Sequence, residues 1–164
     1  MDLNHKELFE KLLQQLQLNH HPDYMEYFKD GSLDSVVVYK QSKRWKFILS
    51  FSDILPFEVY QALELRLKES FESIAETELS IVSREARLTP SHLENYWKKA
   101  IHVSQIKSPL CKDLADKQVP QLKDGQVLVG VENNIIKKQA EENFFPVIEK
   151  AYQQMGFPPF KIRA

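Results

Sequence analysis

The sequence predicts an α+β protein built from two small units, each a three-stranded sheet covered by helices. Large apolar residues occupy every second position over residues 44–51, which is the pattern of a half-buried strand. Over residues 133–155 apolar residues instead recur at helical spacing. The predicted elements follow the order helix, helix, strand, strand, helix, strand twice, first over residues 1–85 and again over residues 90–164.

The composition excludes several classes of protein. Hydrophobic residues make up 43% and charged residues 27% of the 164 positions, which are ordinary values for a globular domain. The net charge of −1 argues against a chain that binds nucleic acid or membranes through its overall charge. Residues 1–84 carry 10 Lys and Arg against 14 Asp and Glu, and residues 85–164 carry 12 against 9. Solvated surface accounts for this mild asymmetry without any partner.

Cysteine content and hydropathy indicate the compartment. A single cysteine, Cys111, leaves no intramolecular disulfide and favours a reducing cytoplasm. The first ten residues are polar and acidic, unlike a secretory signal peptide, and no apolar run approaches the ~20 residues of a membrane span. We therefore expect a cytoplasmic protein that does not enter a membrane.

The first unit is expected to open with two helices. Apolar residues at helical spacing predict an amphipathic helix over residues 4–18, and a short second helix follows Pro22 and ends at Gly31. His20 and His21 lie between them, and adjacent histidines are potential metal ligands. A zinc site needs three or four converging ligands and no other cluster is in view, so a solvated loop is the better interpretation.

Two strands follow, over residues 33–40 and 44–51, and form a hairpin with one aromatic face. Trp45, Phe47 and Phe51 share that face, while the basic residues between them point the other way. Aromatic and basic residues on one sheet would suit the stacking of nucleic-acid bases. A stacking surface would mix both kinds on the same face, so we favour aromatic residues packed under helices.

The first unit ends with a helix that opens at Pro56 and a third strand over residues 77–84. The buried stripe of this helix is predicted to comprise Val59, Leu63, Leu67, Phe71 and Ile74. The short polar segment over residues 85–90 is then the boundary between the two units.

The second unit also opens with two helices. Thr89 or Ser91 caps the first, whose apolar face includes Trp97, and a Ser-Pro dipeptide starts the second. A brief strand over residues 119–122 leads into an Asp-Gly dipeptide at 124–125, which tolerates the positive φ of a tight hairpin turn.

The chain closes with a strand, a long helix and a short strand. The strand covers residues 126–131, and Asn133 caps the helix that follows. Pro146 removes one intrahelical hydrogen bond, so we expect a kink near Glu142. A glycine and two prolines end this helix before the last strand, over residues 160–163. The predicted apolar face of the helix comprises Ile136, Ala140, Phe144, Ile148, Tyr152 and Met155.

No pattern in the sequence predicts catalysis. Paired carboxylates, a cluster of metal ligands and a glycine-rich loop are all missing from it. Cys111 has no evident catalytic partner, because His92 and His102 fall on an amphipathic helix, and we interpret Cys111 as a small buried hydrophobe. We therefore predict no catalytic, cofactor-binding or metal-binding residue in this chain.

Short motifs in both halves resemble one known family. Those of the first half resemble the first N-terminal region of the PolC-type alpha subunit of bacterial DNA polymerase III; they are Trp45-Lys46-Phe47, Leu55-Pro56-Phe57 and the helix end from Phe71 to Ala75. Those of the second half resemble the second N-terminal region of the same family; they are Tyr96-Trp97, Ser108-Pro109 and Gly156-Phe157-Pro158. The resemblance covers nearly the whole chain and preserves the order and spacing of the motifs.

The second half is also similar to domain I of the replication initiator DnaA and to the last domain of the clamp-loader tau subunit. Those domains resemble a truncated type II KH fold and act in protein–protein contacts. The nucleic-acid-binding loop of KH domains, Gly-x-x-Gly before a helix, has no counterpart among the 4 glycines. This departure argues against nucleic-acid binding in the KH manner.

The resemblance implies a function in bacterial chromosome replication. A parent protein of this family is a DNA-directed DNA polymerase with a 3′–5′ exonuclease that uses magnesium. This chain would be its N-terminal interaction module in replisome assembly, with no activity or cofactor of its own. The implied partners are replisome proteins, with the clamp-loader tau subunit, the helicase loader and primase as candidates, while contact with DNA is weak or absent. The alternative is an accessory contact with single-stranded nucleic acid.

Five residues are candidate partner contacts. Trp97, with Lys98 and Lys99 at its rim, would form an interaction hot spot if its ring is exposed. The competing interpretation is that Trp97 belongs to the core. Lys137 and Lys138 lie in the first turns of the long predicted helix, where unpaired backbone N–H groups also favour anions.

Overall fold

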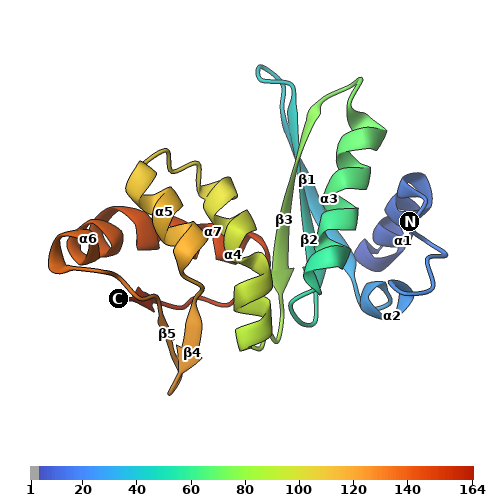
Figure 1. Ribbon diagram of the computed structural model, residues 1–164. Coiled ribbons are helices and arrows are strands. Elements are labelled where there is room, and N and C mark those ends of the chain that lie inside the picture. The colour runs from blue at the N-terminus through green and yellow to red at the C-terminus, as the bar shows by residue number, and fades with distance from the viewer. Residues whose placement is uncertain (1–3) are drawn as a thin grey trace. The chain divides into compact units, whose positions relative to one another are not determined.

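The computed structural model describes residues 4–164, which fall into two compact units (Figure 1). The first unit extends to Ala86 and includes residues 154–156; the second comprises residues 87–153 and 157–164. Each contains a three-stranded sheet with helices, so the predicted α+β class is confirmed. Within residues 4–164 no helix combines the length and hydropathy required to cross a membrane.

Two helices open the first unit. Helix α1 spans His5–Leu16 and begins at Asn4, whose side-chain oxygen accepts a hydrogen bond of 2.8 Å from the backbone N–H of Glu7. Helix α2 is a single turn over Met25–Phe28. The buried face of α1 comprises Phe9, Leu12, Leu13 and Leu16.

The sheet of the first unit contains strands β1 (Ser32–Tyr39), β2 (Arg44–Phe51) and β3 (Glu76–Ser83) in that order. Strands β1 and β2 form the predicted antiparallel hairpin, whereas β3 runs parallel to β2. A parallel neighbour requires a crossover connection, and helix α3 (Phe57–Phe71) provides it.

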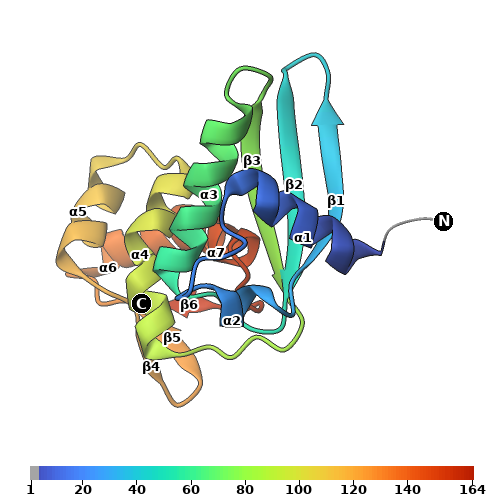
Figure 2. The same ribbon diagram turned by 90° about the vertical axis from the view of Figure 1, so that its right-hand side faces the viewer.

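Helices α1 and α3 lie on the same side of this sheet (Figure 2). The aromatic face of β2 meets them: Phe47 and Phe51 are buried, and the ring of the half-buried Trp45 lies 5.6 Å from that of Phe71. These aromatics therefore pack as core and do not form a surface for base stacking. The prediction for Ile74 is wrong, because α3 ends at Phe71 and leaves this side chain 56% exposed.

Helices α4 (Pro90–Ser104) and α5 (Pro109–Lys117) open the second unit. Thr89 is the cap of α4, since its Oγ accepts a hydrogen bond of 3.1 Å from the backbone N–H of His92. The sheet consists of β4 (Gln121–Lys123), β5 (Gln126–Leu128) and β6 (Ile162–Arg163) in that order, with β4 antiparallel and β6 parallel to β5. The β4–β5 turn is the predicted Asp-Gly pair, and both residues have positive φ.

The long C-terminal helix is divided into three parts: α6 (Asn134–Gln139), a π-helical segment η1 (Ala140–Phe144) and α7 (Phe145–Gln154). Pro146, at the second position of α7, has no N–H to donate to a preceding carbonyl. The backbone N–H of Phe145 bonds instead to the carbonyl of Ala140, five residues back. Near Glu142, where a kink was predicted, the structure has a π-helical turn.

Aromatic residues dominate the core of the second unit. Tyr152 on α7 donates a hydrogen bond of 2.7 Å from its hydroxyl to the carbonyl oxygen of Leu93 on α4. Glu149, three residues before Tyr152 on α7, is also buried. Its Oε2 accepts a hydrogen bond of 2.9 Å from the backbone N–H of Ile162 on β6. These two bonds hold α4, α7 and β6 in one packed unit.

Candidate functional site

Trp97 lies in the core of the second unit. Only 1% of its surface is exposed, and its Nε1 donates hydrogen bonds to the carbonyl oxygens of Gln118 at 2.8 Å and Ala115 at 3.3 Å. The last carbonyls of a helix lack partners within it, and the indole supplies one at the end of α5. The core interpretation of Trp97 therefore holds, and its ring is not open to a partner.

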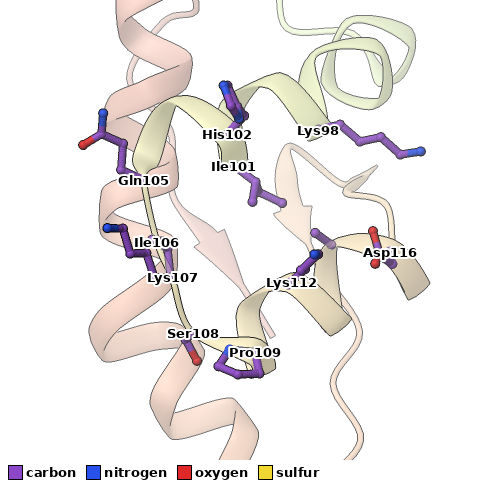
Figure 3. A pocket seen from close by; sticks show the side chains of 11 residues that line it. Lys98, Ile101, His102, Gln105, Ile106, Lys107, Ser108, Pro109, Lys112 and Asp116 are labelled. Atoms are coloured by element: carbon purple, nitrogen blue, oxygen red, sulfur yellow. The ribbon is translucent and has the colours of Figure 1, made fainter.

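A surface hollow opens beside Trp97, between α4 and α5 (Figure 3). Helix α4 contributes Lys98, Ile101 and His102 to its lining, and α5 contributes Lys112 and Asp116. In Figure 3 the side chain of Ile101 points from α4 toward α5. The loop between the helices completes the lining with Gln105, Ile106, Lys107 and Ser108. We call this feature the α4–α5 hollow.

Local sequence explains why these side chains meet. Lys98, Ile101, His102 and Gln105 are spaced by three or four residues and so share one face of α4. Gln105 has a φ of +57°, a left-handed conformation that ends the helix and turns the chain toward α5. Pro109 occupies the first position of α5, where its missing N–H costs little.

The hollow carries an excess of positive charge. Lys98, Lys107 and Lys112 are exposed, and none of the three has an ion-pair partner among residues 4–164. Asp116 is the acidic residue of the lining. Lys117, one residue further along α5, differs from the three: it lies 3.2 Å from Asp113, and this hydrogen bond raises the pKa of its ammonium group. The three unpaired lysines therefore leave an anion-attracting field at the hollow.

The other candidate lysines lie outside the hollow. Lys99 follows Lys98 on α4, but it is half-buried and does not line the hollow. Lys137 and Lys138 are exposed on α6. Asn133 caps that helix as predicted: its side chain accepts the N–H of Ile136 at 2.9 Å, and its carbonyl oxygen accepts the N–H of Lys137 at 3.0 Å. An anion-facing contact at Lys137 and Lys138 stays a prediction.

The structure bears on the residues considered above as a nucleophile and as metal ligands. Cys111 is buried, and burial raises the pKa of its thiol, which disfavours the nucleophilic thiolate. Within residues 4–164 no three His, Cys, Asp or Glu side chains lie close enough together to hold a metal ion. His21 instead stacks on Tyr24 with ring centroids 3.8 Å apart.

Sequence reasoning missed most of the hollow. It selected Lys98 but neither Lys107 nor Lys112, because these residues come from the loop and from the next helix. The spacing of Lys98, Ile101 and Gln105 was a usable signal, since residues three or four positions apart share one side of α4. What no pattern revealed is that α5 folds back to place Lys112 beside this face.

The two units thus form a small α+β protein whose second unit has a basic surface hollow. Two family models match the chain: DNA polymerase III polC-type N-terminus I over residues 8–81, and DNA polymerase III polC-type N-terminus II over residues 95–164. The chain belongs to this family, the N-terminal region of PolC-type DNA polymerase III.

Relatives named DNA polymerase III PolC-type match the chain along nearly its whole length. The protein from Pediococcus pentosaceus is 36% identical over 163 residues, which is 99% of this chain and 11% of that protein. The protein from Bacillus subtilis is 31% identical over 156 residues, covering 95% of this chain and 11% of that protein. The chain therefore spans about a tenth of the length of these relatives. No solved structure matches it, so the likeness of the second unit to a truncated KH fold stays a prediction.

Proposed function

We propose that this chain is a non-catalytic protein-interaction module of a PolC-type replicative DNA polymerase and contributes to replisome assembly. Membership of the PolC N-terminal family supports the placement of this module in a replicative DNA polymerase. The observation that carries the interaction is the α4–α5 hollow, which is lined by apolar side chains and by three lysines that have no ion-pair partner among residues 4–164. Lysines that have no ion-pair partner in the described part of the chain are available to a second protein.

The whole protein in this proposal is a cytoplasmic DNA polymerase with a 3′–5′ exonuclease, as its relatives' name suggests for the polymerase part. Both reactions need carboxylates that hold metal ions ~4 Å apart. Within residues 4–164 no three His, Cys, Asp or Glu side chains gather at one point, so magnesium for these reactions would be held by residues of other regions. The module would contribute contacts and no chemistry.

Replisome proteins are the expected partners, with the clamp-loader tau subunit, the helicase loader and primase as candidates. Single-stranded nucleic acid is the second candidate, because lysines also neutralise phosphates. Its binding would weaken steeply as salt is added. The slope of the logarithm of the binding constant against the logarithm of the salt concentration would give the number of phosphates neutralised. Residues 1–84 have a net charge of −4 and residues 85–164 a net charge of +3. This difference favours the second unit as the binding site, whether the partner is an acidic protein or nucleic acid.

Direct binding measurements distinguish these functions. The chain is immobilised, and purified tau subunit, helicase loader, primase and an oligodeoxythymidine of ~20 nucleotides are passed over it separately in 150 mM salt. We expect one of the proteins to bind and the oligonucleotide to bind at least tenfold more weakly. Binding of the oligonucleotide alone would replace the proposed function with nucleic-acid contact. Polymerase or exonuclease activity of the isolated chain in magnesium would refute its non-catalytic role.

A further inference from the structure

The α4–α5 hollow combines two kinds of surface. Its floor includes the aliphatic side chains of Ile101 and Ile106, both half-buried. Its edges carry Lys98, Lys107 and Lys112, all exposed. The hollow is open to solvent, and one aliphatic side chain laid on the two isoleucines would remove apolar surface from water.

The charge of the side chains that line the hollow determines which sign of charge a ligand must carry. Three lysines and one carboxylate, that of Asp116, line the hollow, so its net charge is positive. Ser108 precedes α5 without making a side-chain capping bond, so the partial positive charge of this helix end adds to the field of the lysines. A ligand with carboxylates beside an aliphatic group therefore complements the hollow.

The residues that line the hollow also favour a protein segment over nucleic acid as the ligand. Single strands are held by aromatic side chains on which the bases stack, and no aromatic side chain other than His102 lines the hollow. Trp97, the nearest large ring on α4, is turned into the core. A phosphate backbone would pair with the lysines but would leave the isoleucine side chains exposed to water.

We propose that the α4–α5 hollow binds a short acidic protein segment that carries an aliphatic side chain. Carboxylates of the segment pair with Lys98, Lys107 and Lys112, and the aliphatic side chain covers Ile101 and Ile106. This inference rests on the proposed function and names the chemistry of the partner at that site. It also requires that binding weaken with salt and with loss of the aliphatic group, since both surfaces contribute.

Three synthetic octamers test the proposal on the full 164-residue chain by amide NMR titration. The first has a central Leu-Ile pair flanked by Asp and Glu, the second replaces that pair with Ser-Ser, and the third is oligodeoxythymidine. We expect the first octamer to shift the amides of residues 98–116, and the other two to bind at least tenfold more weakly. The double variant Lys98→Glu with Lys112→Glu should reduce binding of the first octamer at least tenfold.

A matched control is Lys123→Glu with Lys150→Glu, which makes the same charge change at exposed lysines of the same unit outside the hollow. This control should bind the first octamer within about twofold of the unchanged chain. Equal or tighter binding of oligodeoxythymidine, shifts confined to residues outside 98–116, or no shift at millimolar peptide would each overturn the proposal. If a whole replisome protein still binds in that case, the proposed function stands and only the assigned chemistry fails.

Discussion

The indole Nε1 of Trp97 on α4 donates a hydrogen bond of 2.8 Å to the backbone carbonyl oxygen of Gln118, the residue that ends α5. This bond ties the two helices that form the hollow. Trp97→Phe keeps an aromatic ring in the core but leaves the carbonyl without its donor, so we expect the free energy of unfolding to fall by about 1–3 kcal/mol. Urea denaturation of the second unit measures this loss, and a change below about 0.5 kcal/mol would mean that the bond adds no stability.

Phe144 gives a second test of the core, at the π-helical turn. Its side chain is 5% exposed, and Phe144→Ala should lower the free energy of unfolding by about 3–5 kcal/mol, through lost burial and the cavity that remains. The neighbouring Asn143 is exposed, and Asn143→Ala should change the stability by no more than about 0.5 kcal/mol. Similar values for the two variants in urea denaturation would show that the helix faces the other way.

Gly31 in the first unit lies against two core rings. A Cβ at this position would be 2.5 Å from the ring of Phe9 and 2.7 Å from that of Phe51, and these rings cannot retreat in a packed core. Gly31→Ala should therefore destabilise the first unit by about 1–3 kcal/mol. In a double-mutant cycle, Phe9→Leu should relieve part of this cost. Strictly additive losses would contradict the contact.

High pH should weaken the second unit. Burial raises the pKa of Tyr96 and Tyr152 above the ordinary value of about 10, because the charged phenolate is disfavoured inside the protein. A raised folded-state pKa means that the stabilisation is fully present below pH ~10 and is lost progressively as the pH rises above it. Urea denaturation at pH 7, 9, 10 and 11 measures the decline. Tyr152→Phe should be less stable at pH 7 but show a shallower decline, and an unchanged slope would contradict the linkage.

Much of the fold could be predicted from the sequence because its signals are local. The alternation over residues 44–51 located β2, and Asn133 and the Asp-Gly pair located a helix start and a hairpin turn. Predictions that depended on the ends of elements were less secure. Ile74 continues the apolar spacing of α3 but lies beyond its last turn, so it remains exposed.

The candidate site was harder to predict because it depends on tertiary structure. A tryptophan followed by two lysines is compatible with an exposed hot spot and with a core residue, and spacing alone does not separate them. The deciding fact is that the carbonyl oxygen of Gln118, 21 residues away, lies within reach of the indole. Lys112 joins Lys98 for the same reason, since the fold of α5 against α4 brings them to one hollow.

The most direct test of the account is the affinity of the chain for the replisome protein proposed to bind it, measured when charge is reversed inside or outside the hollow. Isothermal titration would compare Lys98→Glu with Lys112→Glu against the control Lys123→Glu with Lys150→Glu, after circular dichroism has shown equal folding of both. We predict that the first pair weakens binding at least tenfold and that the control stays within about twofold of the unchanged chain. Equal affinities for the two double variants would contradict a contact through the α4–α5 hollow.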